Sequence, residues 1–81
     1  MLNNQKAKLD KETVVKLVGS RVREIRLENK QTIEALAFSS DMEYTQLSRI
    51  ELGKINTSLF QIYKISRSLN ISVAEIMHVL P

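Results

Sequence analysis

Apolar residues recur at steps of three and four along this chain of 81 residues, and no stretch alternates apolar with polar residues strictly enough for a strand. Such spacing places the apolar side chains on one face of an α-helix, where they can pack against other helices. The one proline is the last residue, so this strong helix breaker is missing from the interior of the chain. The sequence therefore predicts an all-α protein.

Capping residues divide the chain into helices expected near residues 11–29, 33–39, 43–51, 59–69 and 73–79. The residues suited to the N-caps are Asp10, Thr32, Ser58 and Ser72. Ser72 and Glu75 have the spacing of a capping box, whereas Gly53 and Asn70 suit left-handed helix stops. These signals predict five helices joined by short turns.

Two helices carry further packing signals. Gly19 lies in the middle of the first expected helix, where glycine lowers helix stability, so we expect another helix to pack closely against it. In the fourth expected helix, the apolar residues expected to face inward are Leu59, Ile62, Ile65 and Leu69.

The length predicts a single domain over residues 10–81, preceded by a flexible tail over residues 1–9. The chain has no cysteine, which excludes disulfides, cysteine-ligated zinc and thiol catalysis. No apolar run approaches the roughly 20 residues needed to cross a bilayer, and the N-terminus has no apolar signal core. We therefore expect a cytoplasmic protein that does not enter a membrane.

Positive charge gathers in the first third of the chain. Residues 1–30 carry eight Lys and Arg against four Asp and Glu, whereas residues 31–81 carry four against five. A basic N-terminal third suits a nucleic-acid partner, although a solvated helix face explains the same charge equally well. Charge alone leaves both interpretations open.

Residues 33–52, IEALAFSSDMEYTQLSRIEL, show how two short helices could cross steeply through a tight turn. Ala37 provides the small residue needed where the helices touch, and Asp41 tolerates the positive φ that the turn requires. The apolar residues that flank this crossing are Leu36, Met42, Leu47 and Ile50. This spacing predicts a helix-turn-helix unit.

From about Val18 to Ile76 the chain resembles the Cro/repressor (Xre-type) family of helix-turn-helix DNA-binding transcriptional regulators. VGSRVREIRLENK resembles the family's first helix, and SRIELGKINTSLFQIYKISRSLNIS resembles its Ser-x-x-Glu-x-Gly-Lys stretch and fourth helix. The resemblance implies a five-helix, lambda-repressor-like domain whose third helix enters the major groove of double-stranded DNA. It implies no enzymatic activity, catalytic residue, metal, cofactor or small-molecule ligand. Asp41, Gln31 and Glu43 depart from the family pattern.

The resemblance also assigns roles to individual residues. The expected base contacts are Tyr44, Thr45, Ser48 and Arg49, and the expected phosphate contacts are Thr32, Ile33, Lys54 and Asn56. Arg26 and Glu51 correspond to positions that form a partly buried ion pair, and burying Arg26 without a partner would be costly.

A palindromic operator needs two recognition helices, so we expect a homodimer. The expected interface is the apolar C-terminal end, with Ile71, Val73, Ile76, Met77, Val79 and Leu80, although this end could instead close the core. The predicted function is sequence-specific transcriptional regulation, as a repressor or autoregulator. A phage-type repressor, a restriction–modification controller and an antitoxin all remain open. The alternative is a helical protein-interaction module that has lost DNA binding, which Ile33 and Glu43 favour slightly.

Overall fold

The computed structural model describes residues 8–81 and contains five α-helices and no strand within that range. The helices are α1 (Lys11–Glu28), α2 (Ile33–Ser39), α3 (Tyr44–Glu51), α4 (Leu59–Ser68) and α5 (Val73–Met77). All five expected helices are present, with small differences at their ends. Most of the predicted tail, residues 1–7, lies outside the described residues. Among the described helices, none has the length and apolar character needed to traverse a membrane.

The predicted N-caps form in the structure. The side chains of Asp10, Thr32, Ser58 and Ser72 each accept a hydrogen bond from the backbone N–H three residues further on. In α5 the Glu75 carboxylate also accepts from the Ser72 N–H at 3.0 Å, which completes the capping box. At the start of α3, Glu43 has an extended N-cap backbone, but its side chain makes no capping hydrogen bond within the described chain.

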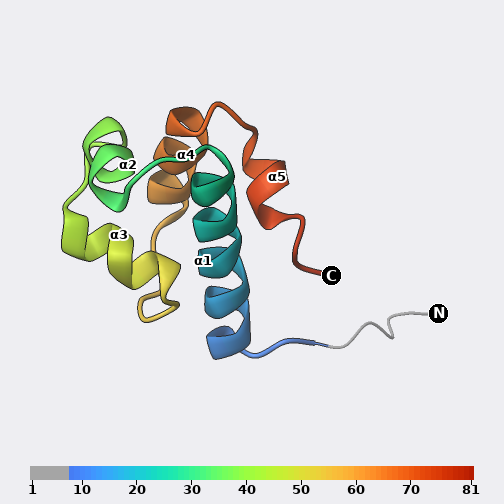
Figure 1. The fold of residues 1–81 in the computed structure, drawn as a ribbon. Helices are drawn as coiled ribbons and strands as arrows, with labels where there is room; N and C mark the ends of the chain where they lie inside the picture. Colours follow the sequence, from blue (N-terminus) through green and yellow to red (C-terminus); the bar gives the residue numbers. More distant parts are fainter. Residues whose placement is uncertain (1–7) are drawn as a thin grey trace.

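The turns use the left-handed conformation where the sequence predicts it. Asp41, Asn70 and Gly53 have φ values of 54°, 59° and 71°. Lys30 also has a positive φ, 57°, which the sequence did not indicate because lysine has no preference for this region. In the turn between α2 and α3, the Met42 N–H donates to the Ala37 carbonyl at 3.0 Å. This turn produces the steep crossing of the two helices (Figure 1).

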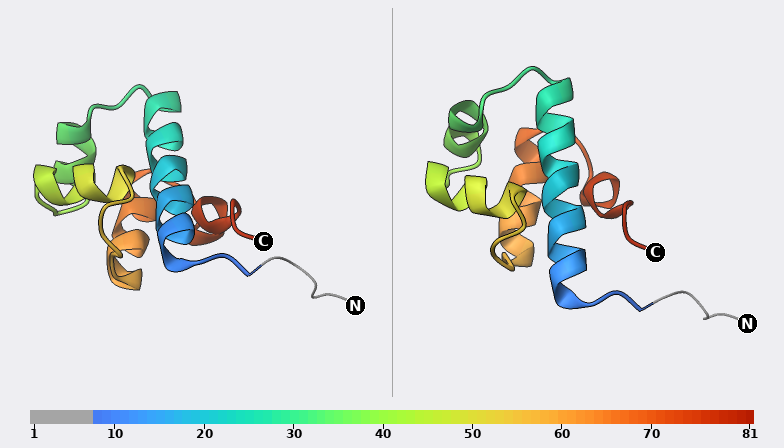
Figure 2. Two further views of the ribbon diagram at one scale, coloured as in Figure 1. Left: turned by 90° about the horizontal axis from the view of Figure 1, so that it is seen from below. Right: turned by 60° about the horizontal axis from the view of Figure 1, so that its bottom comes forward.

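The core lies where all five described helices meet, with α1 between α3 on one side and α5 on the other (Figures 1 and 2). One wholly buried side chain from each helix marks it: Val22, Leu36, Leu47, Ile65 and Ile76, each 0 % exposed. Because Ile76 is enclosed by its own protomer, the prediction that it lines a dimer interface is wrong. The prediction that Leu59 faces inward is also wrong, since this side chain is 76 % exposed.

Candidate nucleic-acid interface

α3 has a fixed inner face and an open outer face. Leu47 and Ile50 are buried against the core, whereas Tyr44, Thr45 and Arg49 are exposed. Ser48, the fourth expected base contact, is half-buried. In Figures 1 and 2, α3 lies at the edge of the molecule, with α1 beside its C-terminal end. Within residues 8–81, the structure therefore leaves most of this outer surface open to a partner.

Gly19 explains how α3 can lie so close to α1. A Cβ atom at this position would overlap the backbone oxygen of Ile50 and would lie 3.0 Å from that of Glu51. The last turn of α3 therefore rests directly on the backbone of α1, which confirms the prediction that another helix packs closely against Gly19. This contact sets how far α3 stands out from the core.

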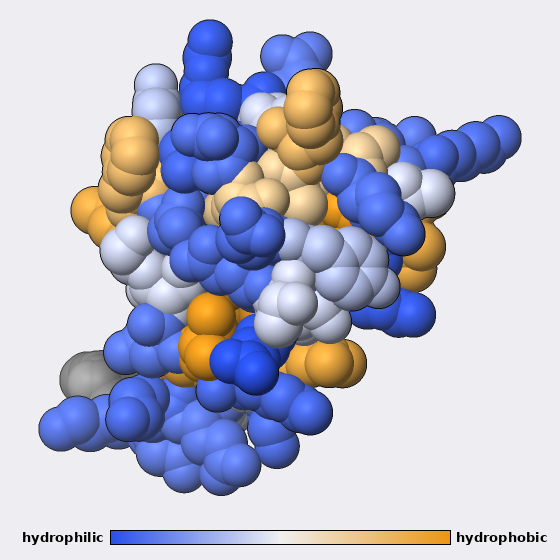
Figure 3. Space-filling model, turned by 90° about the vertical axis from the view of Figure 1, so that its left-hand side faces the viewer, coloured by the Kyte–Doolittle hydropathy of each residue, from blue (hydrophilic) through white to orange (hydrophobic). Residues whose placement is uncertain are grey.

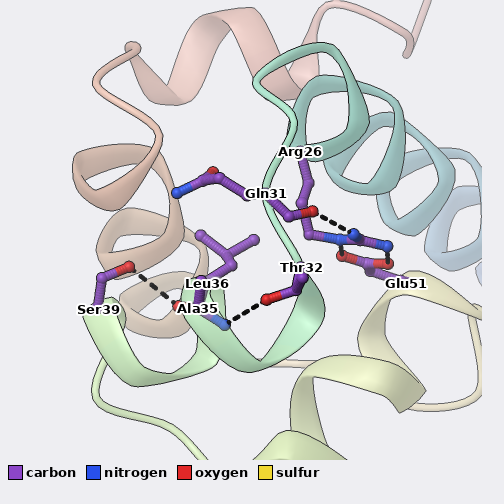
Figure 4. A network of polar contacts seen from close by, with 7 residues as sticks. All are labelled: Arg26, Gln31, Thr32, Ala35, Leu36, Ser39 and Glu51. Atoms are coloured by element: carbon purple, nitrogen blue, oxygen red, sulfur yellow. Dashed lines mark hydrogen bonds and ion pairs between the residues drawn. The ribbon is translucent and has the colours of Figure 1, made fainter.

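Arg26 and Glu51 form the predicted ion pair, and both side chains are buried. Arg26 Nε lies 2.7 Å from Glu51 Oε2, and Arg26 Nη2 lies 3.0 Å from Glu51 Oε1 (Figure 4). The hydrogen bonds to Glu51 raise the pKa of Arg26 above its ordinary value, so the guanidinium stays charged. Its Nη1 also donates to the Gln31 carbonyl at 2.7 Å. One buried cation therefore joins α1, the loop before α2 and the last turn of α3.

The expected phosphate contacts differ in what they can offer. Thr32 Oγ1 accepts from the Ala35 N–H at 3.0 Å, so its hydroxyl already caps α2 (Figure 4). The side chain of Ile33 packs against the core, which leaves only its backbone N–H for a ligand. Lys54 and Asn56 are exposed in the loop between α3 and α4, with no such competing role in the described chain.

Charge on this face is divided between its two ends. Arg49 and Lys54 lie at or just beyond the C-terminal half of α3, whereas Asp41 and Glu43 lie at its N-terminal end. Figure 3 views the side of the molecule that carries α2 and α3, and hydrophilic residues cover most of it. Apolar side chains touch one another in the upper middle of this view and form smaller separate groups elsewhere. A surface of this kind favours a charged, hydrated partner over an apolar one.

The family model described as Helix-turn-helix matches residues 22–76, which include α2, the turn and α3. The chain belongs to this family. It is therefore a helix-turn-helix DNA-binding transcriptional regulator and not an enzyme, and its fold is lambda-repressor-like, as the resemblance implied.

Two relatives share substantial sequence with this chain. Control protein C.BamHI from Bacillus amyloliquefaciens is 40% identical over 62 residues, which are 75% of this chain and 76% of the relative. The crystal structure of the restriction-modification controller protein C.AhdI from Aeromonas hydrophila has a TM-score of 0.75 and 32% identity, and covers 76% of this chain and 94% of C.AhdI.

A third similarity concerns the fold alone. The clp gene regulator ClgR from Corynebacterium glutamicum has a TM-score of 0.79 with 24% identity, and the match covers 82% of this chain and 70% of ClgR. At this level of identity the comparison supports the helical arrangement and carries no inference about the operator or the partner.

Two surface features were missed by the sequence prediction. Leu59 and Tyr63 are exposed on α4 beside Phe60, although helical spacing placed Leu59 inward. Lys16 packs against Gly53 at the end of α3, a contact between residues far apart in the sequence. Neither feature has a local signal, because each depends on how α1 and α4 are oriented in the folded chain.

Proposed function

We propose that this chain recognises a specific double-stranded DNA sequence by placing α3 in the major groove, and that it represses or autoregulates transcription in this way. The observation that carries the proposal is the division of α3 into two faces. Leu47 and Ile50 pack the helix against the core, while Tyr44, Thr45 and Arg49 are exposed in the described part of the chain. A helix of this width fits the major groove, where each base pair presents a distinct set of donors and acceptors.

The outer residues suit different parts of the DNA. Arg49 can donate two hydrogen bonds to a guanine edge, and the Thr45 methyl can contact a thymine methyl. Tyr44 and Ser48 can contact a base edge or a nearby phosphate. Lys54 and Asn56 suit the phosphate backbone, as do the first backbone N–H groups of α2 after Thr32. Glu43 would repel phosphate, so it fits only beside a donor such as a cytosine amino group.

Selection of binding sites from random duplex DNA tests this assignment. Arg49→Ala should weaken binding by about 1–3 kcal/mol and relax the preference at one base pair of each half-site. Lys54→Ala should instead weaken binding evenly across sequences and reduce the salt dependence of binding. If Arg49→Ala lost the same affinity on every sequence, Arg49 would contact phosphate rather than a base.

The relatives suggest which genes are controlled. The 40% identical relative is named a control protein, and the 32% identical structure is a restriction-modification controller protein. These similarities favour a controller of restriction–modification genes over a phage-type repressor or an antitoxin. We expect the selected sequence to occur upstream of the coding sequence of this chain or of an adjacent endonuclease gene. Its absence from both positions would contradict the controller assignment.

We also propose that the protein binds DNA as a homodimer, through a surface on α4 that shares only Val73 with the interface predicted from the sequence. Leu59, Phe60 and Tyr63 are 76 %, 65 % and 49 % exposed, and with Val73 they border one apolar hollow. Of the residues predicted earlier for the interface, Val73 alone borders this hollow. Like Ile71, Met77 and Leu80 it is partly buried against the core, and Val79 is half-buried. A second copy covering these α4 residues would remove a large apolar area from water.

Sedimentation of charged variants tests the dimer surface. Leu59→Glu should convert a dimer into a monomer and should abolish tight binding to a palindrome while leaving weak binding to a half-site. For sedimentation, Phe38→Glu is a matched control, because Phe38 is 89 % exposed on α2 and lies outside this hollow. An unaltered chain that sediments as a monomer at the concentrations of tight operator binding would refute dimeric recognition.

A further inference from the structure

An open groove of about 620 Å³ lies between the first turns of α1 and the loop that follows α3. Three exposed lysines line it: Lys11 and Lys16 from α1 and Lys54 from the loop. Asn56 completes the loop side. Among the described residues that line the groove, Glu12 is the one acid, and its Oε2 lies 3.4 Å from Lys16 Nζ. The groove is therefore positively charged overall.

The two walls of this groove are held together by backbone packing. Gly53 has a φ of 71°, and a Cβ atom added to it would lie 2.8 Å from Lys16 Cα. The backbone of Lys16 therefore rests on the turn that ends α3. The adjacent Lys54 N–H donates to the Arg49 carbonyl at 2.8 Å, so this loop continues directly from α3. Lys16 and Lys54 thus start from fixed positions on either side of the groove.

We propose that this groove holds successive phosphates of one DNA strand, beside the base pairs that α3 contacts. The inference rests on the proposed function, because it extends the backbone contact from Lys54 and Asn56 to Lys11 and Lys16. Lysine ammonium groups on long stems neutralise phosphates without reading bases. α1 thereby adds affinity that is independent of the DNA sequence, while α3 retains control of base choice.

DNA fits this groove better than an acidic peptide does. The groove is continuous with the loop already proposed to meet the phosphate backbone, so a DNA strand could pass through both without leaving the surface. The contact between Lys16 and Gly53 also sets the distance between the two walls of the groove, so the groove exists before any partner binds. Glu12 opposes any anion in the groove, and this charge gives the proposal a test in which two variants change affinity in opposite directions.

Charge substitutions in the groove should change binding without changing specificity. Lys11→Gln should weaken binding to the selected operator and should lower the slope of log affinity against log salt by about 0.9 per lost phosphate contact in each protomer. Glu12→Gln should strengthen binding and steepen that slope. Both effects should be the same on every sequence, and the base preferences from random-duplex selection should remain unchanged.

Arg67→Gln is the matched control for the lysine variant. Arg67 is exposed on α4 and does not line the groove, but it borders a hollow with Phe60 and Tyr63 of the proposed dimer surface. Sedimentation must therefore first show that Arg67→Gln keeps the assembly state of the unaltered chain. Arg67→Gln changes the net charge by the same amount as Lys11→Gln, so any effect of net charge alone on DNA binding appears in both variants. Thermal unfolding of each variant shows whether the fold is retained, and fluorescence anisotropy with a labelled operator duplex measures the affinity at each salt concentration.

Ethylation interference locates the contacts. Some phosphates should weaken DNA binding by the unaltered chain when they are ethylated, but should not weaken binding by Lys11→Gln. These phosphates should lie next to the ones identified in the same way with Lys54→Ala. The proposal would be overturned if the salt dependence of binding were the same for Lys11→Gln and Arg67→Gln. It would also be overturned if Lys11→Gln gave the same ethylation interference pattern as the unaltered chain. If DNA binding were unchanged but transcription by RNA polymerase were lost, the groove would bind an acidic protein instead. Failure of the unaltered chain to bind any duplex would refute the proposed function itself.

Discussion

Replacing Gly19 with alanine sets two physical effects against each other, and the structure decides which is larger. Gly19 lies in the middle of α1, where helix propensity alone favours alanine by about 1 kcal/mol. The added Cβ, however, would overlap the Ile50 backbone oxygen and crowd that of Glu51 at 3.0 Å. These are backbone atoms of a packed helix, so neither can rotate away as a flexible side chain could.

The overlap places this substitution at the upper end of the cost of overpacking, about 1–3 kcal/mol. After the gain in helix propensity, the free energy of unfolding should fall by about 2 kcal/mol. In a chain of this length, such a loss lowers Tm by roughly 8–16 °C. The displaced α3 should also bind the operator more weakly, because Gly19 sets the distance between α3 and α1.

Urea and thermal unfolding measure this loss, and Ser20→Ala provides the control. Ser20 is exposed on α1, so alanine there gains helix propensity without meeting α3, and it should stabilise the protein slightly. If the Tm of the Gly19→Ala variant were equal to or higher than that of the unaltered chain, α1 and α3 would not be in the close contact that the structure describes.

Other perturbations follow from buried and capping groups. Glu51→Ala should lower the free energy of unfolding by about 3–5 kcal/mol, because it leaves Arg26 charged and unpaired, whereas an apolar pair at both positions should be close to neutral in urea titrations. Ile76→Ala should cost about 2–5 kcal/mol and should not separate a dimer, which sedimentation can check. The hydrogen bonds from Thr13 lower the pKa of Asp10, so its cap stabilises α1 above the unfolded pKa of about 3.9 and is lost as the pH falls through the folded pKa. The protection of the Thr13 amide against hydrogen exchange, taken relative to the intrinsic exchange rate at each pH, should therefore fall in acid, and Asp10→Ala should remove that pH dependence.

Much of the fold could be predicted because its signals are local. A serine, threonine or aspartate at an N-cap acts on residues within one turn, so Asp10 and Ser72 indicate helix starts without tertiary information. Asp41 and Gly53 likewise mark left-handed turns from residue type alone. The pairing of Arg26 with Glu51 joins distant residues, and it could be predicted only through the resemblance to a known family.

The predictions that proved wrong share a different physical cause. Helical spacing identifies an apolar stripe but cannot say where along the helix the contact with the core begins. In α4 that contact includes Ile62, so Leu59, in the first turn, extends into solvent although it lies on the same stripe. Ile76 shows the reverse error, since an apolar C-terminal end looks the same in sequence whether it covers its own core or a second protomer.

The short length of α3 links stability to recognition. Of its eight residues, only Leu47, Ile50 and Glu51 are buried, so a small inner face orients every group that the proposed binding mode assigns to DNA. Substitutions of exposed groups such as Thr45 and Arg49 should therefore change operator affinity with little effect on unfolding. Substitutions of the inner residues should change both together, because a helix that shifts on the core also shifts in the groove. A variant of Leu47 that unfolds more easily yet keeps the full base preference would show that α3 is oriented by DNA rather than by the fold.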